Sequence, residues 1–287
     1  MSCAELVAAT NFSFLRGASH PKDMVLTALL LGHRGLGVAD RNTVAGVVRA
    51  HAALKEVRKG GVLPPMRQRE GSGPGEYRYA PSALAREDEE TEALRVLAQE
   101  RAQNFRLIVG ARLVFADETP DIVVHPRNRA GWGRLCRLLT QGNLRAGKGE
   151  CRLMRDDLLA DARDFLLIVM PLRRKPLDPA FLGALCEAAP GAVWLGATML
   201  RRGDDRRRLA QLEALARRGG APLLAPNDAL YAEPRQLDLQ DVLTCIREGA
   251  TVETIGRRLE INAERHLKHP AEMARLFRDC PRALAET

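Results

Sequence analysis

The sequence of 287 residues predicts an α/β protein whose strands close into a barrel of about seven β/α units, followed by a helical C-terminal extension. Short apolar segments, such as FLLIVM at residues 165–170 and AVWLGA at residues 192–197, alternate with segments of helical period. Strands that are apolar along their whole length are typical of a parallel sheet covered by helices on both faces. The number of such units favours a closed barrel over an open sheet.

The chain begins with the order β-α-β-α. An apolar strand is expected at residues 6–9, followed by an irregular loop. Ser19 is the expected N-cap of the first helix, and Gly32 ends that helix. A second strand, LGVAD, ends at Asp40, and a second helix is expected at residues 43–59. In a barrel of this kind, the loops that follow the strands lie on the functional face.

A segment rich in glycine, proline and charge then interrupts the alternation. Residues 59–87 show neither a helical nor a strand period, so we expect a surface excursion or a disordered insertion. Its basic side chains could contact nucleic acid, but a solvated loop is the simpler interpretation. A highly charged helix is expected to follow at residues 88–102.

Strands and helices alternate again up to residue 228. Two strands, at residues 106–115 and 121–125, are joined by the turn-prone segment ADETP. The expected elements after them are a helix at residues 129–139, a strand at 165–170, a helix at 179–189, a strand at 192–197, a helix at 204–219 and a strand at 222–228.

From residue 237 onward the pattern is helical only. Helices are expected at residues 237–249, 251–267 and 269–287, the last beginning with a proline in its first turn. We therefore divide the chain into a barrel at residues 1–236, with its insertion, and a helical segment at residues 237–287 that leads toward a further domain.

Composition restricts the class of protein. No stretch approaches the roughly 20 apolar residues of a membrane span, and the start MSCAELVAAT lacks the features of a signal peptide, so a cytoplasmic protein is expected. The six cysteines form no closely spaced pair, which argues against structural zinc. The net charge of +8 suits an anionic partner such as nucleic acid, although an arginine-rich composition can also reflect a GC-rich genome.

The strand ends supply few groups for catalysis. Only Asp40, His125 and Asp228 could ligate a metal there, which is too few for a cluster of two or three metals. Each has a structural interpretation, because strand-terminal aspartates often cap the next turn and a single histidine is usually structural. The sequence contains no GxSxG elbow, no GxxxxGK[ST] loop and no HExxH helix.

Arginines are concentrated in the segment RRGDDRRR, at the start of an expected helix. A guanidinium presents a fork of donors that matches phosphate oxygens, so this segment could hold a nucleic-acid backbone. Internal ion pairing on a solvated helix is an equally good interpretation. The candidate nucleic-acid contacts are Arg201, Arg202, Arg206, Arg207 and Arg208.

Several segments together resemble a known family. They are NFSFLRGASHP, GLGVADRNTVAGVVRAH, LIVGARLVF, GRLCRLLT, KGECRL, NDALY, LQDVLTCIREG and INAERHLKHPAEMARLF. In this order they resemble the N-terminal PHP (polymerase and histidinol phosphatase) domain of C-family DNA polymerases. The likeness is to the error-prone, damage-inducible ImuC type more than to the replicative polymerase III alpha subunit. It runs nearly from end to end apart from the insertion, and it implies a distorted, TIM-like (β/α)7 PHP barrel.

Active PHP domains hold a metal cluster, and the resemblance shows which ligand positions this chain has changed. The vestigial metal-site positions are Val7, Ala9, Asp40, Arg41, Arg112, Asp228 and Leu230. Only the two aspartates keep a ligand, and two of the other positions carry a guanidinium, which repels a metal. The resemblance thus implies a metal-free barrel without catalytic residues, in which Arg41 and Arg112 replace the metal's charge and pair with the aspartates.

The function implied by the resemblance is structural. The segment would support an error-prone translesion DNA polymerase, a nucleotidyltransferase of DNA repair and replication that acts after DNA damage. The palm carboxylates of that enzyme, which need Mg, would lie beyond this segment, so the chain is expected to be an N-terminal piece that contains no cofactor. The implied partners are the remainder of the polymerase chain, primer-template DNA, the sliding clamp and accessory mutagenesis proteins, with no membrane.

Two alternatives remain open from the residues. A residual metal-dependent phosphoesterase or 3′-5′ exonuclease would use Asp40, His125 and Asp228 as a reduced metal set. A nucleic-acid-binding module would instead act through the arginines of RRGDDRRR, and its DNA affinity would fall steeply with salt.

Overall fold

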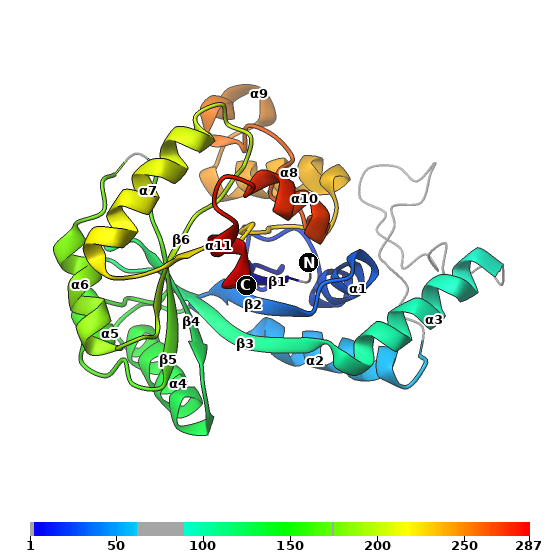
Figure 1. Ribbon diagram of the computed structural model, residues 1–287, viewed down its shortest axis with the longest axis horizontal. Coiled ribbons are helices and arrows are strands. Elements are labelled where there is room, and N and C mark those ends of the chain that lie inside the picture. The colour runs from blue at the N-terminus through cyan, green and yellow to red at the C-terminus, as the bar shows by residue number, and fades with distance from the viewer. Residues whose placement is uncertain (1–2, 62–88, 174) are drawn as a thin grey trace.

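The computed structural model describes residues 3–61, 89–173 and 175–287. Its seven strands form one curled sheet in chain order (Figure 1). These strands are β1 (Ala4–Ala8), β2 (Gly35–Arg41), β3 (Arg106–Leu113), β4 (Asp121–Pro126), β5 (Phe165–Met170), β6 (Val193–Gly196) and β7 (Leu223–Leu224). The expected α/β barrel class is confirmed.

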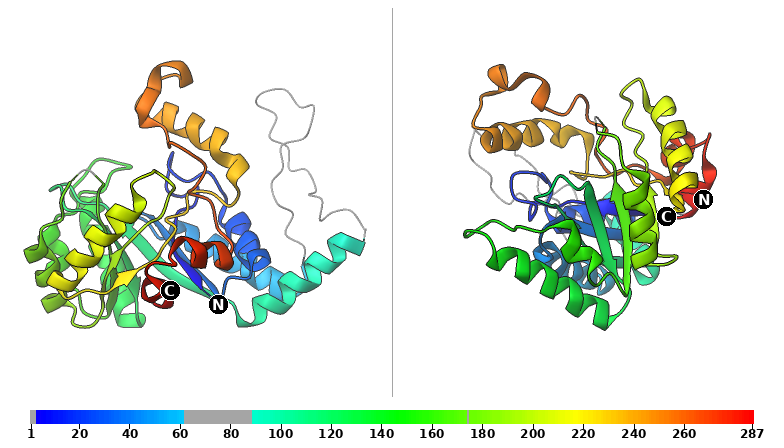
Figure 2. Two further views of the ribbon diagram at one scale, coloured as in Figure 1. Left: turned by 45° about the horizontal axis from the view of Figure 1, so that its top comes forward. Right: turned by 90° about the vertical axis from the view of Figure 1, so that its left-hand side faces the viewer.

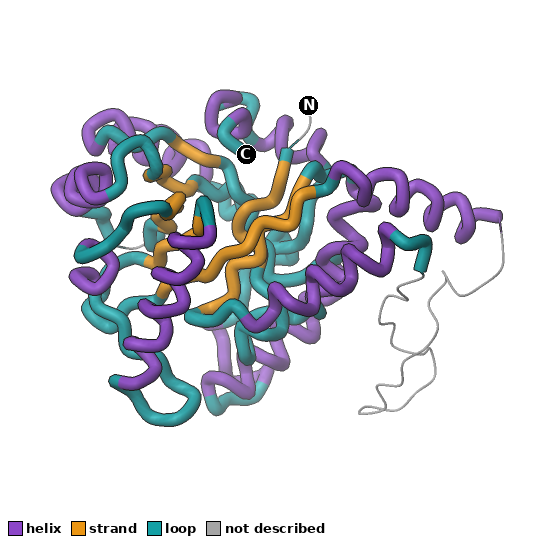
Figure 3. The backbone as a smooth tube through the Cα atoms, turned by 90° about the horizontal axis from the view of Figure 1, so that it is seen from below, coloured by secondary structure: helices purple, strands orange, loops and turns teal. Residues whose placement is uncertain are grey.

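Helices surround the sheet (Figure 3). Within the described residues they are α1 (Pro21–Leu31), α2 (Ala45–Arg58), α3 (Glu89–Asn104), α4 (Arg129–Leu144), α5 (Arg155–Leu159), α6 (Pro179–Ala188), α7 (Asp205–Gly219), α8 (Leu237–Glu248), α9 (Val252–Ile255), α10 (Pro270–Leu276) and α11 (Pro281–Ala285). Helices α4 to α7 lie along one side of the sheet and α1 to α3 along the other, while α8 and α9 lie across one end (Figures 1 and 2).

Helix α1 shows how local sequence sets an element's bounds. It begins at Pro21, whose fixed φ suits a first turn, and it ends at Gly32, which adopts a left-handed φ of 82°. The expected N-cap Ser19 was wrong by one residue, because His20 holds that position without a side-chain cap. The Ser19 hydroxyl instead donates to Gln236 Oε1 at 2.7 Å and accepts from the Ala232 N–H at 2.8 Å.

Strand β4 departs from the expected all-parallel sheet. It runs antiparallel to both β3 and β5, whereas the other neighbouring strands pair in parallel. Only residues 114–120 connect β3 to β4, and a parallel crossover needs roughly a dozen residues or more. The short connection therefore forces the chain to turn back on itself.

The curled sheet is closed by the segment that follows β7. This strand has only two residues, so the strand expected at residues 222–228 continues as irregular chain. The Ala9 N–H nevertheless donates to the Ala229 carbonyl at 2.9 Å. Two residues earlier in the chain, the Asn227 N–H donates to the buried Glu5 carboxylate at 2.8 Å. The Asn227 side-chain oxygen accepts from Lys268 Nζ at 3.0 Å. Backbone and buried polar groups thus join the last part of the barrel to the first strand.

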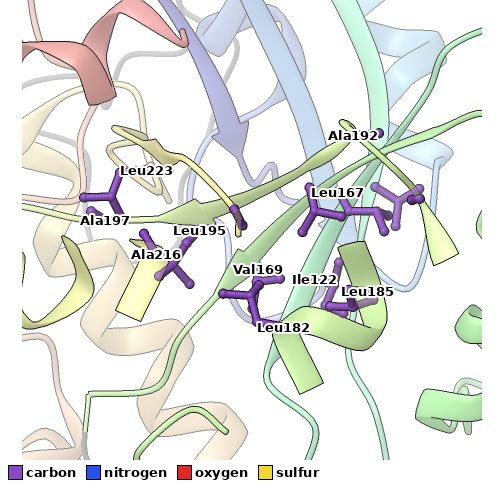
Figure 4. Close-up of a cluster of buried hydrophobic side chains, with 14 of the residues drawn as sticks. Ile122, Leu167, Val169, Leu182, Leu185, Ala192, Leu195, Ala197, Ala216 and Leu223 are labelled. Carbon is purple, nitrogen blue, oxygen red and sulfur yellow. The ribbon is translucent and has the colours of Figure 1, made fainter. Parts of the chain in front are cut away.

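The largest core cluster lies between the sheet and its outer helices. In Figure 4, Val169 and Leu195 of the sheet face Leu182 and Ala216 of helices α6 and α7, and all four belong to this cluster. Each fully buried leucine or valine contributes roughly 1.5–3 kcal/mol relative to its exposed state. The cluster is therefore a main source of the barrel's stability.

The last two helices contribute to the same core. Phe277, which follows α10, is 1% exposed, and side chains of α11 belong to the cluster that includes β5 and β6. The Ala225 N–H also donates to the Ala283 carbonyl at 2.9 Å. The division expected at residue 236 stays a prediction, but the chain after it packs against the barrel.

The helix expected at residues 251–267 was wrong. Helix α9 ends at Ile255, because Gly256 takes a φ of 56°. A short 3-10 helix, η3 (Gly256–Arg258), follows, and irregular chain runs from there to α10. The insertion expected at residues 59–87 lies outside the described residues except for its first three. No helix in the described ranges is long and apolar enough to cross a membrane.

Candidate functional site

Asp40, at the end of β2, is fully buried and holds the loop between β1 and α1. Its carboxylate accepts hydrogen bonds from the Thr10 N–H at 2.7 Å, the Thr10 hydroxyl at 2.9 Å and the Ser13 hydroxyl at 2.7 Å. Burial raises the pKa of Asp40, although these hydrogen bonds act in the opposite direction. Helix α2 packs closely behind, because a Cβ at Gly46 would lie 2.2 Å from Asp40 Oδ2. The carboxylate therefore serves the loop as a structural acceptor.

His125, on β4, is 3% exposed inside the barrel. Its two ring nitrogens lie 3.0 Å from the Val109 carbonyl and 2.9 Å from the Leu6 carbonyl, on two other strands. Burial lowers the pKa of His125, while the two carbonyls favour the protonated ring. Both ring nitrogens face backbone carbonyls, so neither is directed at a metal.

Asp228 is held between two guanidinium groups. Arg112 Nη2 pairs with Asp228 Oδ1, and Arg265 Nη2 lies 2.6 Å from Asp228 Oδ2. Each arginine also has a second carboxylate, since Arg112 lies 3.4 Å from Asp121 and Arg265 lies 2.9 Å from Glu260. Burial alone would raise the pKa of Asp228, but the two arginines outweigh it and lower that pKa. The ionised carboxylate is the form that this arrangement favours.

The predicted pairing of arginines with the aspartates is thus found for Arg112 and Asp228. It is not found for Arg41 and Asp40, because Asp40 is bound by Thr10 and Ser13 and Arg41 makes no ion pair within the described chain. Apolar side chains occupy the other vestigial positions. Val7 is 1% exposed in a cluster with Val123 and Ile168, and Ala9 packs with Leu230.

A cavity of about 150 Å³ opens where β1, β2 and β3 end. It is lined by Ala9, Ser13, Arg16, Ala39, Arg41, Arg112, Asp121, Leu230, Gln240, Thr244, Arg247, Arg258, Glu260 and Arg265. Part of the lining comes from α8, from the 3-10 helix η3 and from the irregular chain after η3. We call this cavity the arginine pocket. A larger cavity of about 210 Å³ lies beside Pro171 and Phe181 and contains none of the predicted site residues.

The arginine pocket includes residues that the sequence did not indicate. Arg247 donates to the Leu15 carbonyl at 2.8 Å, which ties α8 to the loop between β1 and α1. Leu15 adopts a φ of 55°, which is uncommon for a bulky residue and marks a strained loop. Arg258, Glu260 and Arg265 lie in a segment expected to be helical, so periodicity gave no sign that they face the strand ends.

The residues do not fit the metal cluster that the resemblance implies for active PHP domains. Asp40, His125 and Asp228 each make their hydrogen bonds or ion pairs with other groups. Across the part of the chain that the structure describes, no three His, Cys, Asp or Glu side chains gather in a group that could hold a metal ion. Guanidinium groups surround the position, and their charge opposes a cation.

The arginines of RRGDDRRR do not form one phosphate-facing group. Arg201 lies 2.6 Å from Glu272 and Arg202 lies 2.5 Å from Glu260, both in the C-terminal segment. Arg208 donates to the Pro171 carbonyl at 2.7 Å and is half-buried. Arg206 and Arg207 are exposed at the start of α7, and a nucleic-acid contact stays a prediction for all five arginines.

Together, the fold and this site define an α/β barrel with arginines at its mouth. The chain is homologous to proteins named error-prone DNA polymerase. It is 46% identical over 285 residues to the protein from Brucella abortus biovar 1 (strain 9-941), and 46% identical over 286 residues to that from Rhodopseudomonas palustris (strain BisB5). Each alignment covers 99% of this chain but only 23% and 22% of the relative, so the chain spans less than a quarter of their length. The predicted resemblance to error-prone polymerases is confirmed.

Solved structures resemble the chain more loosely. A protein described as a metal-dependent phosphoesterase from Bifidobacterium adolescentis ATCC 15703 is 14% identical with a TM-score of 0.46, over 79% of this chain and 87% of that one. An amidohydrolase from Chromobacterium violaceum, with bound sulfate and no metal, is 12% identical with a TM-score of 0.44, over 78% and 85% of the two chains. No family model matches the chain.

Proposed function

We propose that this chain is the PHP domain of an error-prone translesion DNA polymerase and acts there as a metal-free, non-catalytic structural module. In the cell, this role belongs to the damage-induced mutagenesis complex in the cytoplasm, where it supports DNA synthesis across lesions. The proposed partners are the remainder of the polymerase chain, primer-template DNA, the sliding clamp and the accessory mutagenesis proteins. The polymerase as a whole requires Mg for nucleotidyl transfer, whereas this segment holds no cofactor.

The observation that carries the proposal is the position of Asp228 between Arg112 and Arg265. A carboxylate at a metal site must offer its oxygens to the ion, but both oxygens of Asp228 are occupied by guanidinium groups. The side chains of all three residues are 13–16% exposed, so solvent screens these pairs only weakly. Two arginines therefore supply the positive charge that a metal supplies in an active barrel.

The competing proposal is a residual metal-dependent phosphoesterase or 3′-5′ exonuclease. A decisive assay incubates the purified protein with end-labelled DNA and Mn²⁺, beside a D40A/D228A variant whose folding is checked by circular dichroism. We expect no hydrolysis by the wild-type protein above that of the variant, because the two aspartates already have other partners. Release of labelled nucleotide by the wild type alone, at a rate that rises with protein concentration, would contradict the structural role.

A further inference from the structure

The arginine pocket carries more positive charge than its carboxylates balance. Six arginines line it, against the two carboxylates of Asp121 and Glu260. Two carboxylates outside the lining also pair with its arginines: Asp228 with Arg112 and Arg265, and Glu248 with Arg247 and Arg258. Glu260 is shared with Arg202, which lies outside the lining, so the six lining arginines exceed these four carboxylates by at least two positive charges.

The excess belongs to Arg16 and Arg41. Neither guanidinium forms an ion pair within the described ranges, whereas each of the other four arginines has at least one carboxylate within 4.0 Å. Both side chains are partly buried, and burial lowers the pKa of each. Neighbouring arginines lower these pKa values further: Arg41 and Arg247 act on Arg16, and Arg112 and Arg247 act on Arg41. Asp121 raises both pKa values and Glu248 raises that of Arg16, but neither carboxylate forms an ion pair with Arg16 or Arg41. The two guanidinium groups therefore have no direct anionic partner within the described chain.

A neutral polar group in the same pocket also lacks a partner. Gln240, on α8, is 2% exposed, and its amide oxygen makes no hydrogen bond within the described chain. A buried amide group left unpaired costs stability, and a half-turn of the amide would present its NH₂ donors instead. Gln240 is held in a lining otherwise rich in donors, which is the composition of a site for an acceptor.

We propose that the arginine pocket binds a dianionic phosphoryl group through Arg16 and Arg41, with Gln240 as a neutral donor. The planar fork of arginine matches phosphate oxygens, and two charges on the ligand would balance the two unmatched guanidinium groups. The volume of about 150 Å³ is sufficient, because an apolar cavity of similar size in another protein holds benzene. A terminal phosphate monoester carries close to two charges and an internal phosphodiester only one, so the end of a DNA strand or free phosphate fits better than the middle of a strand.

The test is a titration of the purified protein with three probes at low salt. These are inorganic phosphate, a 5′-phosphorylated oligonucleotide, and the same oligonucleotide with a 5′-hydroxyl. We expect phosphate to bind saturably and to raise the melting temperature, since a ligand that binds only the folded state stabilises it. Preference for the phosphorylated oligonucleotide, with competition by phosphate, would identify a strand end. Equal binding of the two oligonucleotides, unaffected by phosphate, would identify the free anion as the ligand.

Matched variants distinguish phosphate binding in this pocket from binding to positive charge elsewhere on the surface. R16Q/R41Q should lower phosphate affinity by about tenfold for each arginine, because each loses a charge-assisted hydrogen bond. R41K keeps the charge without the fork, so it should lose less affinity than R41Q. The control R217Q/R218Q removes two exposed arginines from the last turn of α7, outside the pocket lining, and should bind as the wild type does.

We expect R16Q/R41Q to fold, because neither arginine has an ion pair to lose; circular dichroism and thermal melting check this. The proposal is overturned if phosphate does not bind the wild-type protein, or if R16Q/R41Q and R217Q/R218Q weaken binding equally. It does not depend on the proposed function. DNA hydrolysis with Mn²⁺ would defeat the structural role without abolishing phosphate binding, and a lack of phosphate binding would leave the structural role standing.

Discussion

Replacing Asp228 by asparagine removes the central anion of the barrel mouth and little else. Asn has the same shape as Asp, and it tolerates the left-handed backbone of this position, where φ is 57°. The change leaves Arg112 and Arg265 without the carboxylate that lies between them. D228N therefore tests the electrostatic role of the residue with minimal disturbance of the backbone.

The expected cost is about 3 kcal/mol of unfolding free energy. Removing one partner of a buried ion pair typically costs 3–5 kcal/mol, because the other charge is left uncompensated. The lower end applies here, since Arg112 keeps Asp121 at 3.4 Å and Arg265 keeps Glu260 at 2.9 Å. For a chain of 287 residues, 3 kcal/mol corresponds to a fall in melting temperature of about 5 °C.

Thermal and urea unfolding of D228N, wild type and D279N measure this effect. Asp279 is 52% exposed and lies 3.5 Å from Arg206, so its replacement should cost about 0–1 kcal/mol. Because the folded state lowers the pKa of Asp228, its stabilisation is present at neutral pH and is lost as the pH falls through that pKa. The difference in unfolding free energy between wild type and D228N should therefore disappear in acid. A cost at neutral pH no larger than that of D279N would refute the reasoning.

Three further predictions concern the barrel itself. Burial raises the pKa of Glu5 to about 7, so stability should fall by about 3 kcal/mol as the pH rises from near 4.5 through 7. E5Q should flatten this dependence of stability on pH. The same dependence in E5Q as in the wild type would count against assigning it to Glu5. G46A should destabilise by about 1–3 kcal/mol, because its Cβ would lie 2.2 Å from Asp40 Oδ2, whereas G133A meets nothing within 4 Å and should stabilise α4 by about 0.5–1 kcal/mol. Chemical denaturation of both variants would disprove this if the two changes had the same sign. F277A should cost about 3–5 kcal/mol in a single unfolding transition, and a cost below about 1 kcal/mol would show that the C-terminal helices are not part of the core.

Most of the fold follows from local pattern. The strand expected at residues 165–170 is β5 without any shift, and the glycine stop at Gly32 ends α1 as expected. The antiparallel direction of β4 could also be predicted from the sequence, because the connection of residues 114–120 is too short for a parallel crossover. The break in the helix at Gly256 was harder to predict, since a single glycine inside a helical pattern is often tolerated.

The candidate site could be predicted only in part. Asp228 and Arg112 were indicated by the resemblance, and opposite charges at strand ends on the same face of the barrel can pair, although β3 and β7 are not neighbouring strands. Arg265 and Glu260 come from a segment more than 30 residues further along the chain, and only the folded path brings them to Asp228. The sequence pattern gave no signal for this contact, because it predicts a helix over residues 251–267, whereas the chain is irregular between Arg258 and α10.

The most direct measurement is the metal content of the purified protein. The protein would be expressed in medium supplemented with zinc, manganese and iron, and analysed by mass spectrometry of the elements beside a known PHP phosphoesterase. We predict well below one metal ion per chain, because arginines occupy both oxygens of Asp228, hydrogen-bond donors occupy Asp40, and backbone carbonyls face both ring nitrogens of His125. Stoichiometric metal that D228N abolishes would contradict the account.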